Sequence, residues 1–433
     1  MSENLRNLLL FAAVAALILG EGMTASWNSA LGILNMGLIS AILALGVNMQ
    51  WGYAGLFNVG IVGFVALGGL APVLISTPPV LPVWTADGAF RILAALLFGV
   101  GVIGLAILLN ARTKGRTRAL AMLAVLIGGF FLFRAIFDPA VDVVESYLPA
   151  TYSNIGGLGL PVLLSWPVGA LFAAGAAWVI GKTALGLRSD YLAIATLGIG
   201  EIIIAVMKNE DWLARGVKNV ISIPRPVPYE VDLQASPGFV EWAAGFGADP
   251  VTASTVTVKL LYAGLFLAVL AVLMWAAQLA LNSPWGRMMR AIRDNETAAE
   301  AMGKDVTRRH LQIFVIGSAI CGLAGAMIVT LDSQLTPGTY NPLRFTFLIW
   351  VMVIVGGSGN NWGAILGGFL IWFLWIKVEP WGNQLMGFIA AGLSDGPLKT
   401  HLLDSAAHMR LLTMGLVLLL VLRFSPRGLI PEK

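Results

Sequence analysis

Apolar runs, each about long enough to cross a bilayer, recur along almost the whole of this 433-residue chain. Lipid cannot pair with exposed backbone groups, so a run of about 20 apolar residues is expected to be a helix. The sequence therefore predicts an all-α, polytopic membrane protein with about 10–12 transmembrane helices, folded as one domain over residues 1–433. The runs are 6–23, 30–49, 54–76, 91–110, 118–137, 162–181, 190–207, 256–281, 311–331, 345–356, 362–378 and 410–423.

Composition supports this class, since 12% of the residues are charged, against about 25% in soluble domains. Two of the runs, 345–356 and 362–378, flank a glycine cluster and form either two short spans or one re-entrant hairpin. Run 410–423 is short for a full crossing. The first run is interpreted as a retained span, because no A-x-A-like cleavage site follows it.

Lysine and arginine are unevenly distributed among the connections. If the chain begins in the cytoplasm and alternates sides, more than half of the 27 Lys and Arg fall in cytoplasmic connections, most densely at 283–310. Residues 77–90 and 138–160 contain none. The positive-inside rule favours this orientation, with both termini cytoplasmic. Segment 208–255 is then an external loop, either an ordered cap over the outer mouth or a solvated connector.

Residue patterns typical of catalysis, metal binding or nucleotide binding are missing from the sequence. Cys321 stands alone in an apolar run and is interpreted as a packing residue. The three histidines have no zinc-type spacing, and no G-x-x-x-x-G-K-[ST] phosphate loop occurs. We therefore expect no catalytic residue, no metal and no cofactor bound by this chain, and no nucleic-acid partner.

Segment 283–310 is predicted to form two short helices. A serine before a proline starts the first helix, and Asp294 or Asn295 can cap a second over 296–302, which Gly303 ends. Such a helix can lie in a groove of a soluble partner, and the alternative is a connector resting on the bilayer surface. Three apolar residues share one face of it by helical spacing: Ala298, Ala301 and Met302.

Polar side chains within apolar runs are costly in lipid and mark functional positions. Asn48, Gln50 and Asn58 surround a turn that contains Gly52 and Gly55. This arrangement permits a broken helix whose backbone groups meet a substrate. The alternative is that the amide side chains bond neighbouring helices to one another.

Glu201 is the ionisable residue nearest the middle of a run, and Thr196 precedes it on the same helix. A charge there requires a polar cavity, a partner or a proton. Glu201 therefore either meets the ammonium group of a substrate or links helices. Further along the chain, a glycine cluster predicts a tight turn before run 362–378: Gly356, Gly357 and Gly359.

Five segments in a fixed order carry a family resemblance. The stretch RAIRDNETAAEAMG at 290–303 resembles the coupling loop of ABC importer permeases, more narrowly the permease subunits that import branched-chain and related hydrophobic amino acids. The other four segments that are similar to that family are NMQWGYAGLFNVG at 48–60, SDYLAIATLGIGEI at 189–202, GGSGN at 356–360 and PRGL at 426–429.

The resemblance implies a non-enzymatic transport subunit in the bacterial inner membrane, in contact with membrane lipid. It implies a second permease subunit, two cytoplasmic ATPase subunits that hold ATP and Mg, and a periplasmic or extracellular solute-binding protein. The cargo would be a small-molecule amino acid. The implied ATPase-coupling residues are Arg290, Arg293, Asn295, Glu296, Ala298, Ala299, Met302 and Gly303. The substrate-pathway candidates are Asn48, Gln50, Asn58, Thr196 and Glu201.

Two features depart from the family pattern. Residues 215–220 read RGVKNV where the family has a Gly-Gly-Pro-Asn-Gly-like turn, and 91–137 forms an additional helical hairpin. Relatives with similar permeases carry urea or short amides, so these substrates remain an alternative. An ion-coupled secondary transporter is the other alternative, although it would favour several intramembrane acids and related halves.

Overall fold

The computed structural model describes residues 3–148, 153–393 and 396–432, and these residues are predominantly helical. Within these ranges nine helices are long and apolar enough to cross a membrane. A tenth crossing results if the bent pair α18 (Pro397–Ser405) and α19 (Met409–Phe424), joined by the short η5 (Ala406–His408), counts as one span. The prediction of an all-α polytopic membrane protein is thus confirmed.

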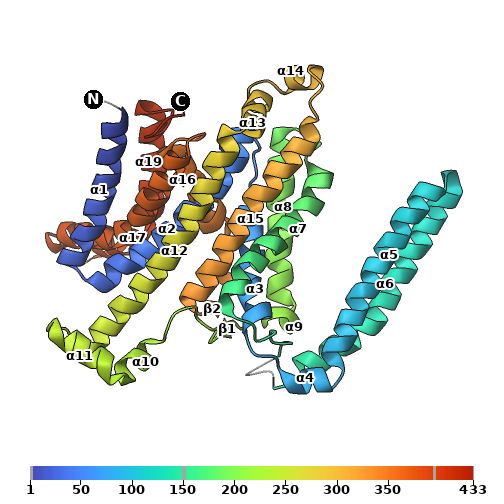
Figure 1. Cartoon of the computed structure of the whole chain (residues 1–433), viewed down its shortest axis with the longest axis horizontal. Helices are drawn as coiled ribbons and strands as arrows, with labels where there is room; N and C mark the ends of the chain where they lie inside the picture. The colour runs from blue at the N-terminus through green and yellow to red at the C-terminus, as the bar shows by residue number, and fades with distance from the viewer. Residues whose placement is uncertain (1–2, 149–152, 394–395, 433) are drawn as a thin grey trace.

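The long helices follow one another along most of the chain (Figure 1). They are α1 (Glu3–Thr24), α2 (Trp27–Val47) with its π-helical extension η1 (Asn48–Gly52), α5 (Gly88–Arg112), α6 (Gly115–Glu145), α7 (Ser165–Ala184, preceded by η2, Val162–Leu164), α8 (Ser189–Asn209), α12 (Pro250–Asn282), α15 (Val306–Asp332) and α17 (Asn361–Ala391). Two shorter apolar helices complete the bundle: α3 (Ile61–Ser76) and the continuous pair η4 (Leu343–Phe347) and α16 (Leu348–Gly356).

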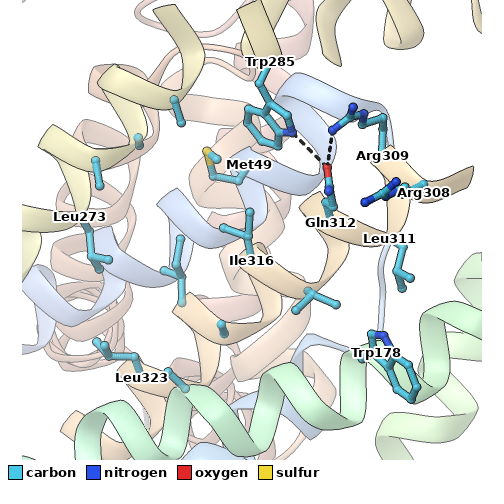
Figure 2. A pocket seen from close by; sticks show the side chains of 17 residues that line it. Met49, Trp178, Leu273, Trp285, Arg308, Arg309, Leu311, Gln312, Ile316 and Leu323 are labelled. Carbon is cyan, nitrogen blue, oxygen red and sulfur yellow. Dashed lines mark hydrogen bonds between the residues drawn. The ribbon is translucent and has the colours of Figure 1, made fainter. Parts of the chain in front are cut away.

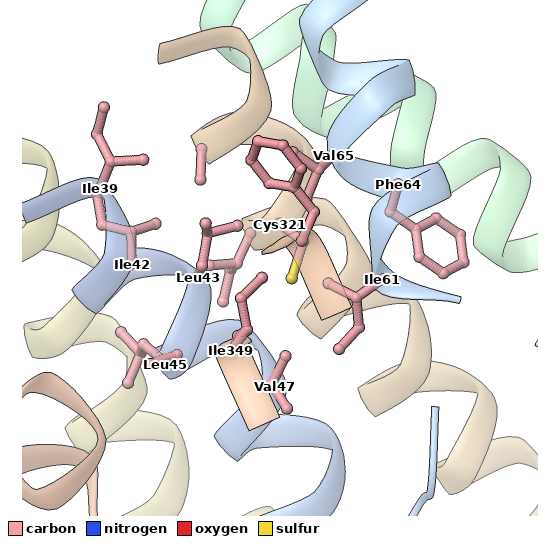
Figure 3. Packing of buried hydrophobic residues seen from close by; sticks show 14 of the residues in the cluster. Ile39, Ile42, Leu43, Leu45, Val47, Ile61, Phe64, Val65, Cys321 and Ile349 are labelled. Atoms are coloured by element: carbon pink, nitrogen blue, oxygen red, sulfur yellow. The ribbon is translucent and has the colours of Figure 1, made fainter. Parts of the chain in front are cut away.

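Helices α2 and α15 form the centre of the bundle, and most of their residues are buried. Helix α15 packs against α2, α3 and α7, while α17 packs against α2 and α16. Figure 3 shows side chains of this core around Cys321, which is 1% exposed. Cys321 therefore has the packing role that its apolar surroundings predict.

Glycines bring α3, α7 and α15 into backbone contact. A Cβ atom added to Gly68 would lie 1.8 Å from the carbonyl oxygen of Gly322, and one added to Gly322 would lie 2.6 Å from that of Gly169. Small residues allow membrane helices to approach closely in this way. A larger side chain at any of these positions would force the helices apart. The close contact between α3, α7 and α15 therefore depends on glycine.

Helices α5 and α6 form a hairpin that extends away from the bundle (Figure 1). It is fastened at its base, where Phe137 meets the ring of Trp212 at 5.7 Å in α9 (Asp211–Ala214), close to α4 (Leu81–Thr85). Large apolar side chains such as Ile103 and Phe131 are exposed along its length. Runs 91–110 and 118–137 thus form a hairpin with few contacts to the rest of the chain.

The two runs beside the glycine cluster form neither two short spans nor one re-entrant hairpin. The pair η4–α16 is too short to cross, but α17 is a full span that continues to Ala391, well beyond the predicted end at 378. Within this continuous helix the charge of Lys377 is paired with Glu21 of α1 at 2.7 Å. Residues 343–391 therefore form a half-length helix, η4–α16, after which the chain turns back along the full-length helix α17.

Segment 208–255 contains regular structure at the end of the bundle opposite the termini (Figure 1). After α9 it forms β1 (Val220–Ile221), α10 (Glu230–Ala235) and α11 (Pro237–Gly245). Strand β1 pairs antiparallel with β2 (Gln334–Leu335), which follows α15 and precedes η3 (Pro337–Thr339). Arg225 also bonds Glu230 at 2.9 Å. These contacts favour the ordered form of this segment over a solvated connector.

Candidate functional site

The helical path is broken between α2 and α3, and Gln50 fixes the break against α15. The chain passes through the π-helical turn of η1, two further helical residues at 53–54 and an irregular stretch at 55–60. Helix α3 therefore begins at Ile61, later than the start of the apolar run at 54. Gln50 Nε2 donates to the carbonyl oxygen of Phe314 at 2.8 Å and to Ser318 Oγ at 2.9 Å. Both acceptors belong to α15, so the break is held against the central helix.

Asn58 connects the same break to two further helices. Its Nδ2 donates to Gln50 Oε1 at 2.9 Å, and its Oδ1 accepts from the Gly60 N–H at 3.0 Å at the start of α3. Its carbonyl oxygen accepts from Trp350 Nε1 of α16 at 3.1 Å. On the other side, Thr196 Oγ1 of α8 accepts from the Val59 N–H at 3.1 Å. Helices α8, α15 and α16 therefore converge on the irregular stretch.

Four of the five predicted pathway residues thus lie together at the break. Asn48, Gln50, Asn58 and Thr196 are each at most 2% exposed, and all four side chains hydrogen-bond to other protein groups. In this conformation they join helices, which is the second of the two interpretations that the sequence left open. A direct contact with substrate requires the break to open.

Glu201 does not lie with the other four residues, contrary to its grouping in the sequence. Its side chain is exposed on α8, on the same outward surface as Tyr191 and Ile202, each 62% exposed. Five residues along a helix correspond to a rotation of about 140° beyond one full turn. Thr196 therefore faces the bundle while Glu201 faces away from it.

The two helices predicted in the basic segment are α13 (Pro284–Asp294) and α14 (Glu296–Ala301). Ser283 Oγ accepts from the Trp285 N–H at 3.2 Å and caps α13. Of the two predicted caps for α14, Asn295 is the one used, since its Oδ1 accepts from the Ala298 N–H at 3.0 Å. Gly303 follows with a φ of +75°, a left-handed conformation that glycine adopts without strain.

Helix α14 turns its predicted apolar face outward, at the end of the bundle that also holds the N- and C-termini (Figure 1). Ala298 and Ala301 are exposed, and Met302, just after the helix, is 78% exposed. Ala299 instead faces inward, where it packs with Ile292 and Val306. Among the other predicted coupling residues, Glu296 is exposed, whereas Arg290 and Arg293 turn back toward the chain.

Arg293 connects this segment directly to the helix break. Its Nη1 donates to the carbonyl oxygen of Gly52, the last residue of η1, and to Glu432 Oε2 at 2.8 Å. Burial alone would lower the pKa of the guanidinium, but the Glu432 and Asp294 carboxylates beside it outweigh burial and raise that pKa. The side chain therefore stays charged and joins α13, η1 and the C-terminal segment.

The glycine turn after α16 meets the same junction. Gly359 donates its N–H to Asn48 Oδ1 at 2.9 Å, and a side chain at Gly52 would overlap both atoms of this bond. Gly357, with a φ of +121°, lies against the C-terminal segment, where the Ile430 N–H donates to the Gly356 carbonyl oxygen at 2.8 Å. Sequence reasoning missed Glu432, because nothing in a short terminal segment indicates that it folds back over this turn.

The described residues form a bundle of membrane-length helices with a hydrogen-bonded break at its centre and an exposed helix linked to that break. The family model for the permease component of branched-chain amino acid transport systems matches residues 140–422. The chain belongs to this family. Within the described ranges, no three His, Cys, Asp or Glu side chains are arranged to hold a metal ion.

Several curated permeases are similar to this chain over different lengths. The chain is 25% identical over 397 residues to the "Probable branched-chain amino acid transport permease protein LivM" of Methanocaldococcus jannaschii, covering 90% of each chain. It is 30% identical over 233 residues to the high-affinity branched-chain amino acid permease LivM of Salmonella typhimurium, covering 53% of each. It is also 24% identical over 296 residues to the fructose import permease FrcC of Rhizobium meliloti, covering 66% of this chain and 68% of the relative. No solved structure matches.

Proposed function

We propose that this permease carries branched-chain or related hydrophobic amino acids into the cell, driven by separate cytoplasmic ATPase subunits. The observation that carries this proposal is the outward apolar face of α14, backed by the Arg293 bond to the break between α2 and α3. The relatives named for branched-chain amino acid transport support the substrate class. An external solute-binding protein would deliver the cargo, and the chain itself would perform no chemistry.

The ATPase subunits would bind and hydrolyse ATP with Mg, and this chain would respond as a mechanical partner. Movement of α14 shifts Arg293, and Arg293 pulls on the Gly52 carbonyl at the end of η1. Gln50 and Asn58 then have to exchange protein partners for water or substrate. Such a change couples two sites only if the ATPase prefers one of the two conformations. In this proposal α14 and both termini lie on the cytoplasmic side.

A second permease subunit is proposed to cover the outward face of α8. Ile194 and Ile202 are 69% and 62% exposed there, with Glu201 between them near mid-helix. A carboxylate that faces lipid at this depth is costly, and such residues face a bundle interior or a water-filled cavity. In the assembled transporter, Glu201 would line the path between the two permeases.

Reconstitution of the chain with its ATPases, second permease and binding protein in liposomes tests the substrate class. We expect ATP-dependent accumulation of labelled leucine or valine that an ionophore does not abolish. Competition by excess isoleucine but not by urea or a short amide would support amino acid transport. Competition by urea or the amide alone would contradict the substrate, and uptake that persists without ATP but collapses with the ionophore would contradict the energy source.

Glu201→Gln is expected to lower kcat/KM for uptake by about 10- to 100-fold, because a hydrogen bond to a charged group contributes about 1.5–3 kcal/mol. The amide keeps the size of the side chain and removes its charge. Glu241→Gln in α11, also an exposed glutamate, is the matched control. The measurement is initial uptake rate together with co-purification of the second permease. Equal kinetics in both variants would remove Glu201 from the pathway.

A further inference from the structure

An apolar cavity of about 880 Å³ lies between α7, α12 and α15 and carries arginines at one end. Figure 2 shows its walls, with Leu273 of α12 and Leu323 of α15 on the side away from Arg308 and Arg309, and Trp178 of α7 along another edge. Trp285 of α13 and Arg309 both bond Gln312 Oε1, at 3.3 and 3.0 Å. The cavity is thus lined by apolar side chains along most of its length, and its polar side chains lie at one end.

The polar end is cationic. Arg308 and Arg309 line it, and Lys182, which is outside the lining, has its Nζ 4.4 Å from the ring centroid of the lining residue Trp178. No acidic residue is among the lining side chains, and neither arginine forms an ion pair with an acid in the described part of the chain. Asp305, which is not among the lining residues, caps the start of α15 by accepting from the Arg308 N–H at 2.9 Å. An anionic group would therefore neutralise this end.

The dimensions match one leaflet of a bilayer. Arg308 and Leu323 lie about 22 Å apart along α15, at a rise of about 1.5 Å per residue. Half of a bilayer with its headgroups is about 20–22 Å thick. Tryptophan side chains such as Trp178 and Trp285 are typical of the level where hydrocarbon meets headgroups. Basic pockets between membrane helices on the cytoplasmic side bind anionic lipid headgroups.

We propose that this cavity is a binding site for one anionic glycerophospholipid of the leaflet adjoining α13 and α14. The acyl chains lie against α12 and α15, and the phosphate contacts Arg308 and Arg309. A helix of the second permease is the competing occupant, but it would leave the cations without an anion. The proposed function also places that subunit on α8, which contributes no residue to the cavity. The lipid site itself does not depend on which substrate is carried.

The test measures lipid retained by the purified full chain in nanodiscs of equimolar phosphatidylglycerol and phosphatidylethanolamine, using native mass spectrometry. We expect one phosphatidylglycerol to be held in preference to phosphatidylethanolamine. The Arg308→Gln/Arg309→Gln variant is expected to bind it at least about tenfold more weakly, since each basic residue near an anionic headgroup contributes substantially to affinity. Arg116→Gln/Arg118→Gln, which removes two exposed arginines at the hairpin tip, is the matched control and should retain the lipid.

A second variant keeps the test decisive if loss of the arginines impairs folding. Ala276→Phe projects a ring into the cavity from an exposed wall position of α12 without changing charge, and it should also expel the lipid. Equal retention of both lipids by the unaltered chain would overturn the proposal, as would equal losses in the two double variants. Loss of the bound phosphatidylglycerol when the chain assembles with its second permease would assign the cavity to that protein instead.

Discussion

Ala298→Asp should lower ATP-driven uptake by at least about tenfold, because a charge buried without a partner in an interface costs several kcal/mol. Ala298 is exposed on α14, and only its backbone N–H takes part in the cap formed by Asn295. The substitution therefore changes the docking face and leaves the helix cap intact. The measurement is uptake of labelled leucine in liposomes, with co-purification of the ATPase subunits as the readout of docking.

Ala298→Ser is the matched control, because it adds a polar group of similar size without a charge. It should keep most of the uptake and the ATPase subunits. Normal uptake by Ala298→Asp would show that α14 does not enter an ATPase groove, and would favour the alternative of a connector on the bilayer surface. Failure of the aspartate variant to reach the membrane would instead show a defect in insertion, which immunodetection of the chain distinguishes.

Arg293→Met is expected to separate ATP hydrolysis from transport. The variant keeps the outward face of α14 but leaves the Gly52 carbonyl and the Glu432 carboxylate without their shared donor. Hydrogen bonds to charged groups contribute about 1.5–3 kcal/mol, so uptake per ATP hydrolysed should fall about tenfold or more. Co-purification of the ATPase subunits should be retained. The measurement is the ratio of leucine transported to phosphate released.

Arg287→Met provides the comparison within the same helix. Arg287 is exposed, and within the described ranges its side chain donates only to the nearby Asn282 carbonyl oxygen, at 3.2 Å. Its loss should therefore leave the ratio unchanged. Glu432→Gln should give an intermediate ratio, because Arg293 keeps the Gly52 carbonyl and loses the charge opposite it. An unchanged ratio in Arg293→Met would remove this side chain from the coupling route between α13 and the helix break.

The local structure of the coupling segment was predictable because its signals lie within a few residues. The caps and the glycine stop predict α13 and α14 almost to the residue. The helix break was equally visible as amides and glycines between two apolar runs. Membrane class and approximate helix count followed from run length alone. Such features depend on neighbouring residues, so tertiary contacts rarely alter them.

Features set by distant contacts could not be predicted in the same way. The apolar run that ends near 378 gives no sign that α17 continues, because Glu21, which pairs with Lys377, lies in α1. Glu201 looked like a neighbour of Thr196 along the sequence, yet helical rotation turns the two residues apart. Glu432 bonds Arg293 although the two residues are 139 positions apart in the sequence. The pairs Lys377–Glu21 and Arg293–Glu432 depend on partners that sequence spacing does not show, whereas the rotation between Thr196 and Glu201 follows from their spacing once the helix is known.

The glycine crossing of α3, α7 and α15 limits which parts of the permease can move during transport. Side chains that interdigitate can repack by changing rotamers, but at Gly68 and Gly322 the backbones themselves touch. Sliding one of these helices past another would drive carbonyl oxygens into Cα atoms. The three helices should therefore move as a rigid body. The unwound stretch at 55–60 is the natural hinge, because it joins α2 and η1 to that block without a regular helix.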